Sequence, residues 1–298
     1  MSPSAGRMLP APNRGWVVGE AGQVSEGTSA RAGTAAGTLL GTGFQPIYSA
    51  RDGTLAGHEA LIRAVDAAGQ PVSPATFFAS APPAETVGLD RACRRVHLSQ
   101  FASLDPGDAP LHLNVHPLAA LEDARARFDL RLELGLHGIR PARVCVEILE
   151  GECGDEVRLA EAVAAYRAVG LRIAMDDFGF ERSNFDRVAA LRPDFVKIDR
   201  LLLSRAVGPA GARRLLPSLV RLLHEADTQV IVEGIEDASE ALFAIETGAD
   251  FLQGYYFGPP RPTLAVDPLP SRLMAGLRRA ATGATEFASP DLPAGAAD

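Results

Sequence analysis

Eight short apolar segments recur through the middle of the chain, and amphipathic segments separate most of them. The apolar segments are typical of buried strands and span residues 44–50, 58–64, 111–117, 143–149, 171–177, 194–199, 229–234 and 251–257. Residues at 84–104, 154–169, 211–226 and 238–247 show helical spacing of apolar positions. Strands that alternate with helices form mainly parallel sheets, so the pattern predicts an α/β fold. Eight strands in one domain favour closure into a barrel, with an open, doubly wound sheet as the alternative.

This pattern ends well inside both termini. Residues 1–38 are rich in small residues and proline, which predicts a flexible N-terminal arm. Residues 283–298 have a similar composition and predict a flexible C-terminal tail. We expect a single domain over residues 39–282, a length typical of one α/β barrel.

Charge and hydropathy limit the partners that the chain can have. The formal net charge is −8, so there is no general basic field to attract DNA or RNA. No apolar run approaches the roughly 20 residues that span a bilayer, and the N-terminus lacks the features of a secretory signal. We therefore expect a soluble cytoplasmic protein without membrane or nucleic-acid partners. Cys93, Cys145 and Cys153 form no C-x-x-C pair, which favours reduced thiols.

Nearly every predicted strand carries one acidic, amide or ammonium side chain. They are Glu59, Asn114, Glu147, Asp176 with Asp177, Lys197, Glu233 and Gln253. An unpaired carboxylate in an apolar strand is costly, so each should be paired or bound to a metal ion. Polar residues at the carboxyl ends of barrel strands converge on one face, where such barrels place their active sites. Any one of these residues has a plain structural interpretation, as a salt bridge or a cap, but the repetition favours a common site.

The chemistry of this predicted cluster points to divalent cations. Carboxylate and amide oxygens are typical ligands of Mg²⁺ or Mn²⁺, whereas a zinc site of the thiolate-rich kind would need cysteines. Two such ions close together are a known device for phosphodiester cleavage.

Several motifs then resemble one family. HEALIR (58–63) resembles the signature of the EAL family, and FQPI (44–47) resembles its first strand. LHLNVHP, VEILE, DDFG, FVKID, VEGIE and QGYYF follow in the family's order, so the resemblance covers residues 40–265. It implies a TIM-barrel-like (β/α)8 fold whose first strand is antiparallel to the others. With no GGDEF-type cyclase block in the sequence, we expect a stand-alone EAL domain.

The resemblance also implies an activity and a site. The expected reaction is hydrolysis of cyclic di-GMP to linear pGpG by a homodimer, with two Mg²⁺ or Mn²⁺ ions per site. The implied metal ligands are Glu59, Asn114, Glu147, Asp176, Asp177 and Glu233. Lys197 would hold or help activate the attacking water and would join Glu59, Asp177 and Glu233 in the catalytic set. Gln45, Arg63 and Gln253 would contact the substrate, and Glu150 and Glu236 would support the loop after the fifth strand.

That loop departs from the family's pattern. The chain reads DDFGFERSNF over residues 176–185, with Phe180, Glu181 and Arg182 where the family usually has small residues. Bulky residues restrict a loop that glycine would leave free. The alternative function is therefore a non-catalytic cyclic di-GMP receptor that signals through a protein partner. Ser183 and Asn184 offer the opposite interpretation, a cap that keeps the loop ordered.

Other polar and aromatic residues are predicted to pack rather than to act. His58 begins a motif like H-E-x-x-H, but Ile62 replaces the second histidine, so a packed or solvent-facing role is expected. His112 and His116 flank Asn114 at the spacing of one strand face, and we favour packing over contact with the site. For Tyr255, Tyr256 and Phe257 we favour packing over stacking on guanine.

Overall fold

The computed structural model describes residues 33–35, 38–104, 106–125, 129–149, 155–178, 185–207, 213–265 and 276. Glu150, Cys153 and the loop at 179–184, with Phe180, Glu181 and Arg182, lie outside the described residues. So do residues 1–32 of the predicted arm and the whole of the predicted tail.

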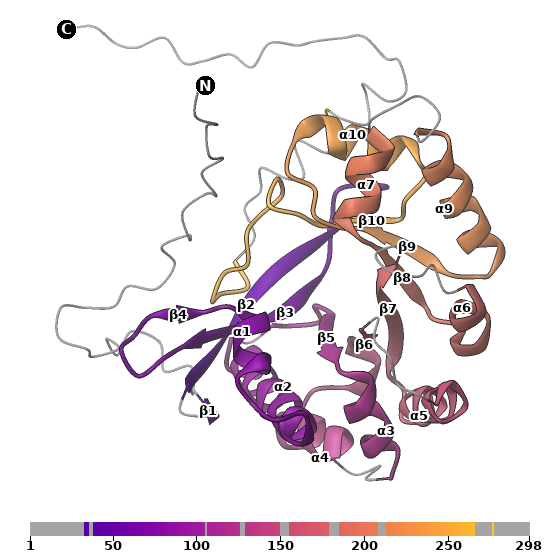
Figure 1. The fold of residues 1–298 in the computed structure, drawn as a ribbon. Coiled ribbons are helices and arrows are strands. Elements are labelled where there is room, and N and C mark those ends of the chain that lie inside the picture. The colour runs from indigo at the N-terminus through magenta and orange to yellow at the C-terminus, as the bar shows by residue number, and fades with distance from the viewer. Residues whose placement is uncertain are drawn as a thin grey trace, which may run out of the picture.

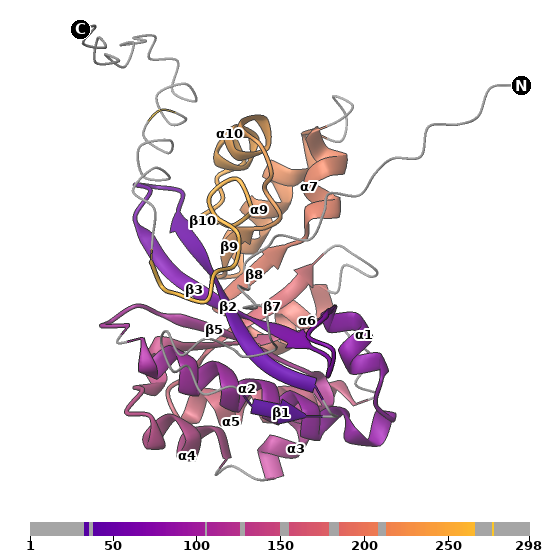
Figure 2. The same ribbon diagram turned by 90° about the vertical axis from the view of Figure 1, so that its left-hand side faces the viewer.

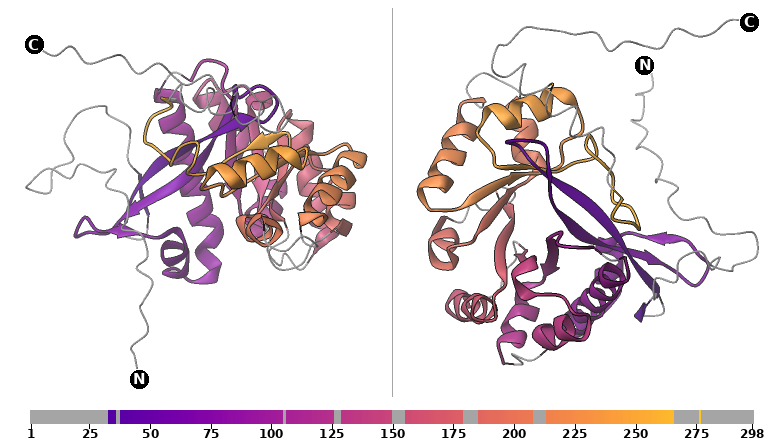
Figure 3. Two further views of the ribbon diagram at one scale, coloured as in Figure 1. Left: turned by 90° about the horizontal axis from the view of Figure 1, so that it is seen from above. Right: turned by 180° about the vertical axis from the view of Figure 1, so that it is seen from behind.

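Eight strands close into a barrel (Figures 1 and 3). Around the barrel they are β2 (Thr38–Ser49), β10 (Phe251–Leu252), β9 (Gln229–Val232), β8 (Phe195–Ile198), β7 (Arg172–Phe178), β6 (Val144–Ile148), β5 (Leu111–Val115) and β3 (Leu55–Val65), which pairs again with β2. Strand β2 is antiparallel to both of its neighbours, and the other six pairings are parallel. The predicted barrel with an antiparallel first strand is confirmed, and the open-sheet alternative is wrong because β3 returns to β2.

Two short strands lie beyond the closed barrel. Strand β1 (Gly33–Ala35) pairs with the start of β2, and β4 (Pro71–Val72) pairs with the end of β3. Strand β1 falls within residues that the sequence analysis assigned to the arm, so sheet pairing begins before the predicted boundary at residue 39.

The helices lie outside the barrel. They are α1 (Pro74–Ala79), α2 (Thr86–Ser103), α3 (Pro117–Arg125), α4 (Asp129–Leu136), α5 (Glu156–Ala168), α6 (Phe185–Leu191), α7 (Arg200–Val207), α9 (Leu215–Glu225) and α10 (Ala238–Glu246), with 3₁₀ turns at Pro83–Glu85 and Pro141–Arg143. Figure 2 shows α1 to α5 around one part of the barrel and α7, α9 and α10 around another. The four predicted helices correspond to α2, α5, α9 and α10. None of the helices in the described ranges is long and apolar enough to cross a membrane.

Local sequence explains where two of the helices begin. The carboxylate of Asp155 accepts a hydrogen bond from the backbone N–H of Arg158, and Asp237 accepts from Ser239 and Glu240. Each aspartate thus satisfies N–H groups that have no partner inside the first helical turn. The starts of α5 and α10 are therefore encoded by single acidic residues at their N-caps.

The two faces of strand β3 contact different regions, the core under helices α1 and α2 and the interior of the barrel. Ala60, Ile62 and Ala64 are buried, and Ile62 and Ala64 pack in a cluster with residues of α1 and α2. Side chains alternate along a strand, so Glu59 and Arg63 project to the opposite face, toward the barrel interior. The same alternation along all eight strands brings the polar residues of the predicted site to one side of the sheet.

A buried ionic network supports the carboxyl end of β5. Arg94 Nε lies 2.8 Å from Asp90 Oδ1, and Arg94 Nη1 donates a hydrogen bond of 2.6 Å to Asp123. The hydroxyl of Tyr166 donates to the same Asp123 carboxylate, so α2, α3 and α5 are joined. The other oxygen of Asp90 accepts the backbone N–H of His116. The network therefore fixes the backbone two residues beyond Asn114.

Candidate active site

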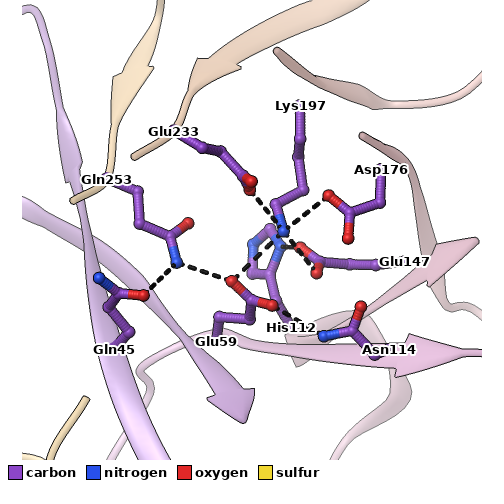
Figure 4. A network of polar contacts seen from close by, with 9 residues as sticks. All are labelled: Gln45, Glu59, His112, Asn114, Glu147, Asp176, Lys197, Glu233 and Gln253. Carbon is purple, nitrogen blue, oxygen red and sulfur yellow. Dashed lines mark hydrogen bonds and ion pairs between the residues drawn. The ribbon is translucent and has the colours of Figure 1, made fainter. Parts of the chain in front are cut away.

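Lys197 lies at the centre of the polar residues inside the barrel (Figure 4). Its side chain is 1% exposed, and its Nζ is within 3.3 Å of four carboxylates. The distances are 2.5 Å to Glu233, 2.7 Å to Glu147, 3.1 Å to Asp176 and 3.3 Å to Glu59. An ammonium has three N–H donors, so these carboxylates offer more acceptor atoms than Lys197 can satisfy.

Register explains how these residues meet. Gln45 of β2 is directly opposite Glu59 of β3, and Asn114 of β5 is opposite Glu147 of β6. Residues at paired positions lie on the same face of a sheet, so each pair points into the barrel together. The polar residues are far apart in sequence and become neighbours only because the strands pair in this order.

Amide groups connect the carboxylates to the substrate-binding residues that the sequence predicts. Gln253 Nε2 donates a hydrogen bond of 2.7 Å to Glu59 and lies 3.2 Å from Gln45 Oε1. Asn114 Nδ2 donates to the other oxygen of Glu59 at 2.7 Å. Gln45 in turn donates to the carbonyl of Gly258. Glu59 is thus held from two sides by amide groups.

Burial and neighbouring charge divide the carboxylates into two kinds. Burial raises the pKa of Glu147, Asp176 and Glu233 above the usual range, although Lys197 acts in the opposite direction. Burial also acts on Glu59, but Lys197 and the hydrogen bonds from Gln253 and Asn114 hold the pKa of Glu59 below its ordinary value. Burial opposes the charge of Lys197, yet the surrounding carboxylates raise its pKa well above normal. The site therefore has an excess of acidic groups over its one buried ammonium.

Asp176 and Asp177 reach the same cleft although they are adjacent in sequence. Consecutive residues of a regular strand point to opposite faces. Here the register of β7 with β8 shifts between Met175 and Phe178, and Asp177 has a φ of 54°. A bulge of this kind redirects a side chain, and a non-glycine residue in the left-handed region is uncommon. Burial, followed by the charge of Asp176, raises the pKa of Asp177 to about 6.

The carboxylates open into a cleft of about 450 Å³. Its lining includes Gln45, Glu59, Leu61, Asn114, Asp176, Asp177, Arg200, Glu233, Gly234, Glu236, Gln253, Gly254 and Tyr255. Glu147 and Lys197 lie beneath this surface, where both side chains are almost completely buried. The predicted metal ligands therefore form one continuous group from the barrel interior to its mouth.

Two other residues singled out in the sequence have positions different from those of the predicted metal ligands. Arg63 is not among the cleft-lining residues, and its guanidinium crosses Gly43, where an added Cβ would lie 3.1 Å from Arg63 Cζ. Glu236 lines the cleft and pairs with Arg200. Its predicted support of the loop at 179–184 stays a prediction, since that loop and Glu150 are outside the described residues.

Two residues have a larger role in the site than their sequence context predicts, and a third, Arg200, has no sequence signal that singles it out. His112 does not only pack: its Nδ1 lies 2.7 Å from Glu147 Oε1. Tyr255 is 59% exposed at the cleft, so packing was the wrong preference there, whereas Phe257 is buried as expected. Arg200 was not considered at all, although it directly follows the FVKID motif.

One compositional signal was also missed. Lys197 is the only lysine in the chain, and the other 28 of its 29 basic residues are arginine. A lysine holds its charge at a single compact point, whereas the guanidinium of arginine is planar and larger. Four carboxylates around one Nζ need such a compact charge.

His58 is packed, as expected, and does not line the cleft that the carboxylates open into. It is 2% exposed, and burial lowers its pKa to about 4. It lines a small separate cavity with Phe44, Tyr48 and Phe257.

The carboxylate oxygens lie close enough together that they could hold divalent ions. One group is Glu59, Glu147 and Asp176, and a second is Asp176, Asp177 and Glu233, with the ligand atoms of each within 4.8 Å of one another. Asp176 Oδ1 and Glu233 Oε1 are buried without a hydrogen bond in suitable geometry, although both are within ion-pair distance of Lys197. Hard oxygen donors of this kind suit Mg²⁺ and Mn²⁺. The residues present therefore fit two divalent ions that share Asp176.

Comparison with known proteins agrees with this geometry. The family model of the EAL domain matches residues 35–260. The chain belongs to the EAL-domain family. YkuI of Bacillus subtilis, an uncharacterised EAL-domain containing protein, is 31% identical over 234 residues, which are 77% of this chain and 57% of YkuI. The probable cyclic di-GMP phosphodiesterase PdeI of Escherichia coli is 30% identical over 238 residues, covering 75% of this chain and 29% of PdeI.

Solved EAL structures share the fold. YkuI in complex with cyclic di-GMP and calcium superimposes with a TM-score of 0.72 at 28% identity, over 82% of this chain and 61% of that one. The calcium and cyclic di-GMP complex of BlrP1 from Klebsiella pneumoniae gives a TM-score of 0.67 at 25% identity, over 74% and 56%. The EAL domain thus spans only part of each relative, about a third to just over half of the curated sequences.

Proposed function

We propose that this EAL domain hydrolyses cyclic di-GMP to linear pGpG with two Mg²⁺ or Mn²⁺ ions. The observation that carries the proposal is the convergence of five carboxylates, the amide of Asn114 and the only lysine of the sequence at one end of the barrel. Glu59, Asn114, Glu147, Asp176, Asp177 and Glu233 are the proposed metal ligands. Bound ions would lower the pKa of a water molecule and neutralise charge on the phosphodiester.

The side chains of the chain itself orient the reactants. Gln253 and Asn114 fix both oxygens of Glu59, so that this carboxylate stays ionised and in one orientation. Lys197 carries the only buried positive charge in the cluster, and we propose that it holds the attacking water. His112 orients Glu147 from the side opposite Lys197, which limits the rotation of that carboxylate.

The cleft has features for the rest of the nucleotide. Gln45 and Gln253 offer amide groups at its base, and Tyr255 presents an exposed aromatic ring on which a guanine base can stack. Arg63 remains a proposed substrate contact from the edge of β3. The cyclic di-GMP bound to YkuI and to BlrP1 supports this ligand class, and the description of PdeI supports the reaction.

The proposal is tested by incubating the chain with cyclic di-GMP and either Mg²⁺ or Mn²⁺, and by following pGpG with chromatography and mass spectrometry. We expect product with at least one of the ions and none with EDTA. Glu59→Gln should form no product, whereas Asp108→Ala, which removes an exposed carboxylate on another part of the surface, should match the unmodified protein. No product at any neutral or alkaline pH would refute the hydrolase assignment.

The receptor alternative is separated from hydrolysis by a binding measurement. If calorimetry detects binding of cyclic di-GMP but no pGpG forms, the chain is a receptor. The bulky residues at 180–182 would then be the first to replace in a search for the cause of the missing activity. The homodimer and the cytoplasmic location also stay proposals. Analytical ultracentrifugation with and without nucleotide tests the first, and cell fractionation tests the second.

A further inference from the structure

Arg200 is the one cation that lines the cleft among the described residues. Lys197 is buried beneath the cleft surface and surrounded by carboxylates, while Arg63 is not part of the lining. The side chain of Arg200 is 41% exposed, so its guanidinium is accessible to a ligand. All other charged groups in the lining are carboxylates, and five of them lie there: Glu59, Asp176, Asp177, Glu233 and Glu236.

The stem of Arg200 lies against a glycine that has room for no side chain. Gly234 has a φ of 65°, and a Cβ added to it would lie 2.4 Å from Arg200 Cβ and 2.9 Å from Arg200 Cγ. Glycine is therefore required for both conformation and close approach. The contact joins the start of α7 to the turn after β9, directly beside Glu233.

One nitrogen of the guanidinium makes both of the polar contacts that hold it. Arg200 Nη1 donates to the carbonyl oxygen of Gly234 at 3.2 Å and forms an ion pair with Glu236. Within the described part of the chain, Nε and Nη2 make no hydrogen bond. The pair of parallel N–H groups that arginine uses for bidentate recognition is thus left available.

A preorganised guanidinium on the rim of the cleft matches the chemistry of a cyclic dinucleotide. Arginine binds two oxygens of a phosphate, or O6 and N7 of guanine, through such a pair of N–H groups. Because Gly234 and Glu236 already restrict the side chain, little conformational entropy remains to be lost on binding. One guanylate half of cyclic di-GMP would lie over the carboxylates, and the other half would then lie at the rim of the cleft, near Arg200.

Resting on the proposed function, we infer that Arg200 is a ligand-binding residue of this site. It contacts acceptor atoms in the guanylate half of cyclic di-GMP that is not being hydrolysed. Glu236 acts through Arg200 as a positioning residue, which is a role distinct from the loop support expected from the sequence.

Calorimetry of the full chain with cyclic di-GMP in the presence of Ca²⁺ tests the inference. We expect Arg200→Ala to weaken the Kd for the nucleotide by about 10- to 100-fold, the usual worth of hydrogen bonds to a charged group. Arg200→Lys keeps the aliphatic stem and the positive charge but lacks the planar pair of N–H groups. Its Kd should therefore lie between those of the unmodified protein and Arg200→Ala. Arg140→Ala removes an exposed arginine from a surface ion pair with Asp108 and should leave the Kd unchanged.

A second titration, with Mn²⁺ alone, separates ligand contact from a structural role. If Arg200 contacts the nucleotide, Arg200→Ala should retain the unmodified protein's Kd for Mn²⁺. A loss of Mn²⁺ affinity equal to the loss of nucleotide affinity would assign Arg200 to the support of Glu233 and overturn the inference. So would an unchanged nucleotide Kd in both Arg200 variants. Failure of the unmodified protein to bind cyclic di-GMP would instead refute the proposed function.

Discussion

Replacing Lys197 with methionine should reveal how strongly the carboxylates depend on one buried charge. Methionine has about the length of the lysine stem but no ammonium, so packing is nearly retained and the four ion pairs are lost. The free energy of unfolding should then fall. Glu147 and Asp176 are buried, so solvent compensates poorly for the lost charge of Lys197.

The size of the effect follows from the burial of both partners. Removing one member of a buried ion pair costs about 3–5 kcal/mol. Burial already favours protonation of Glu147, so one carboxyl can take up a proton instead of staying charged, and we expect the lower end, about 3 kcal/mol. For a domain of this size that corresponds to a melting temperature lower by about 6–12 °C.

Divalent ions should remove most of this deficit. An ion held by the same carboxylates supplies positive charge where the ammonium was, so saturating Mn²⁺ should reduce the difference between the two proteins to about 1 kcal/mol or less.

The measurement is denaturant unfolding of both proteins, in EDTA and in Mn²⁺, at pH 7. Arg140→Met is the matched control, because its ion pair is exposed and such pairs contribute only about 0–1 kcal/mol. Equal stability of Lys197→Met and the unmodified protein in EDTA would refute the buried cluster. A deficit that is the same with and without Mn²⁺ would refute the metal assignment.

Four further predictions use other parts of the site. Asp176→Asn should lower turnover of cyclic di-GMP by more than about 100-fold, because both proposed ions share this residue, while circular dichroism stays unchanged. The raised pKa of Asp177, about 6, means that the folded protein holds this proton more tightly than the unfolded chain. In EDTA, stability should therefore be greatest below pH 4 for this group and fall by about 1–2 kcal/mol as pH rises through 6, whereas Mn²⁺ affinity should rise over the same range. Gly234→Ala should cost about 2 kcal/mol or more in denaturant unfolding, since φ is positive and Arg200 occupies the space, and an unchanged midpoint would contradict the close contact. Tyr255→Ala should weaken nucleotide binding by about 5- to 50-fold in calorimetry with no change in melting temperature, and unchanged affinity would exclude stacking.

Local sequence was sufficient for the class of fold and for most of the carboxylates that meet inside the barrel. The period of two in residues 58–64 and the helical period in 84–104 reflect which faces are buried, and burial follows from the residues themselves. A carboxylate such as Glu147 within an apolar strand needs a partner wherever that strand lies, so its importance is visible without coordinates. The order of the motifs then identifies the barrel and its antiparallel first strand.

Only the tertiary structure decided which of these groups touch. Adjacent residues of a strand should diverge, yet the bulge at Asp177 sends both aspartates into one cleft, and nothing in a periodic pattern marks a positive φ at that position. The contact of His112 with Glu147 depends on strand register. The contact of Arg200 with Gly234 depends on the close approach of the start of α7 to the turn after β9. A sequence pattern indicates which face of a helix or strand is buried. Closure of the sheet determines which residues each buried face contacts, and those contacts make the site.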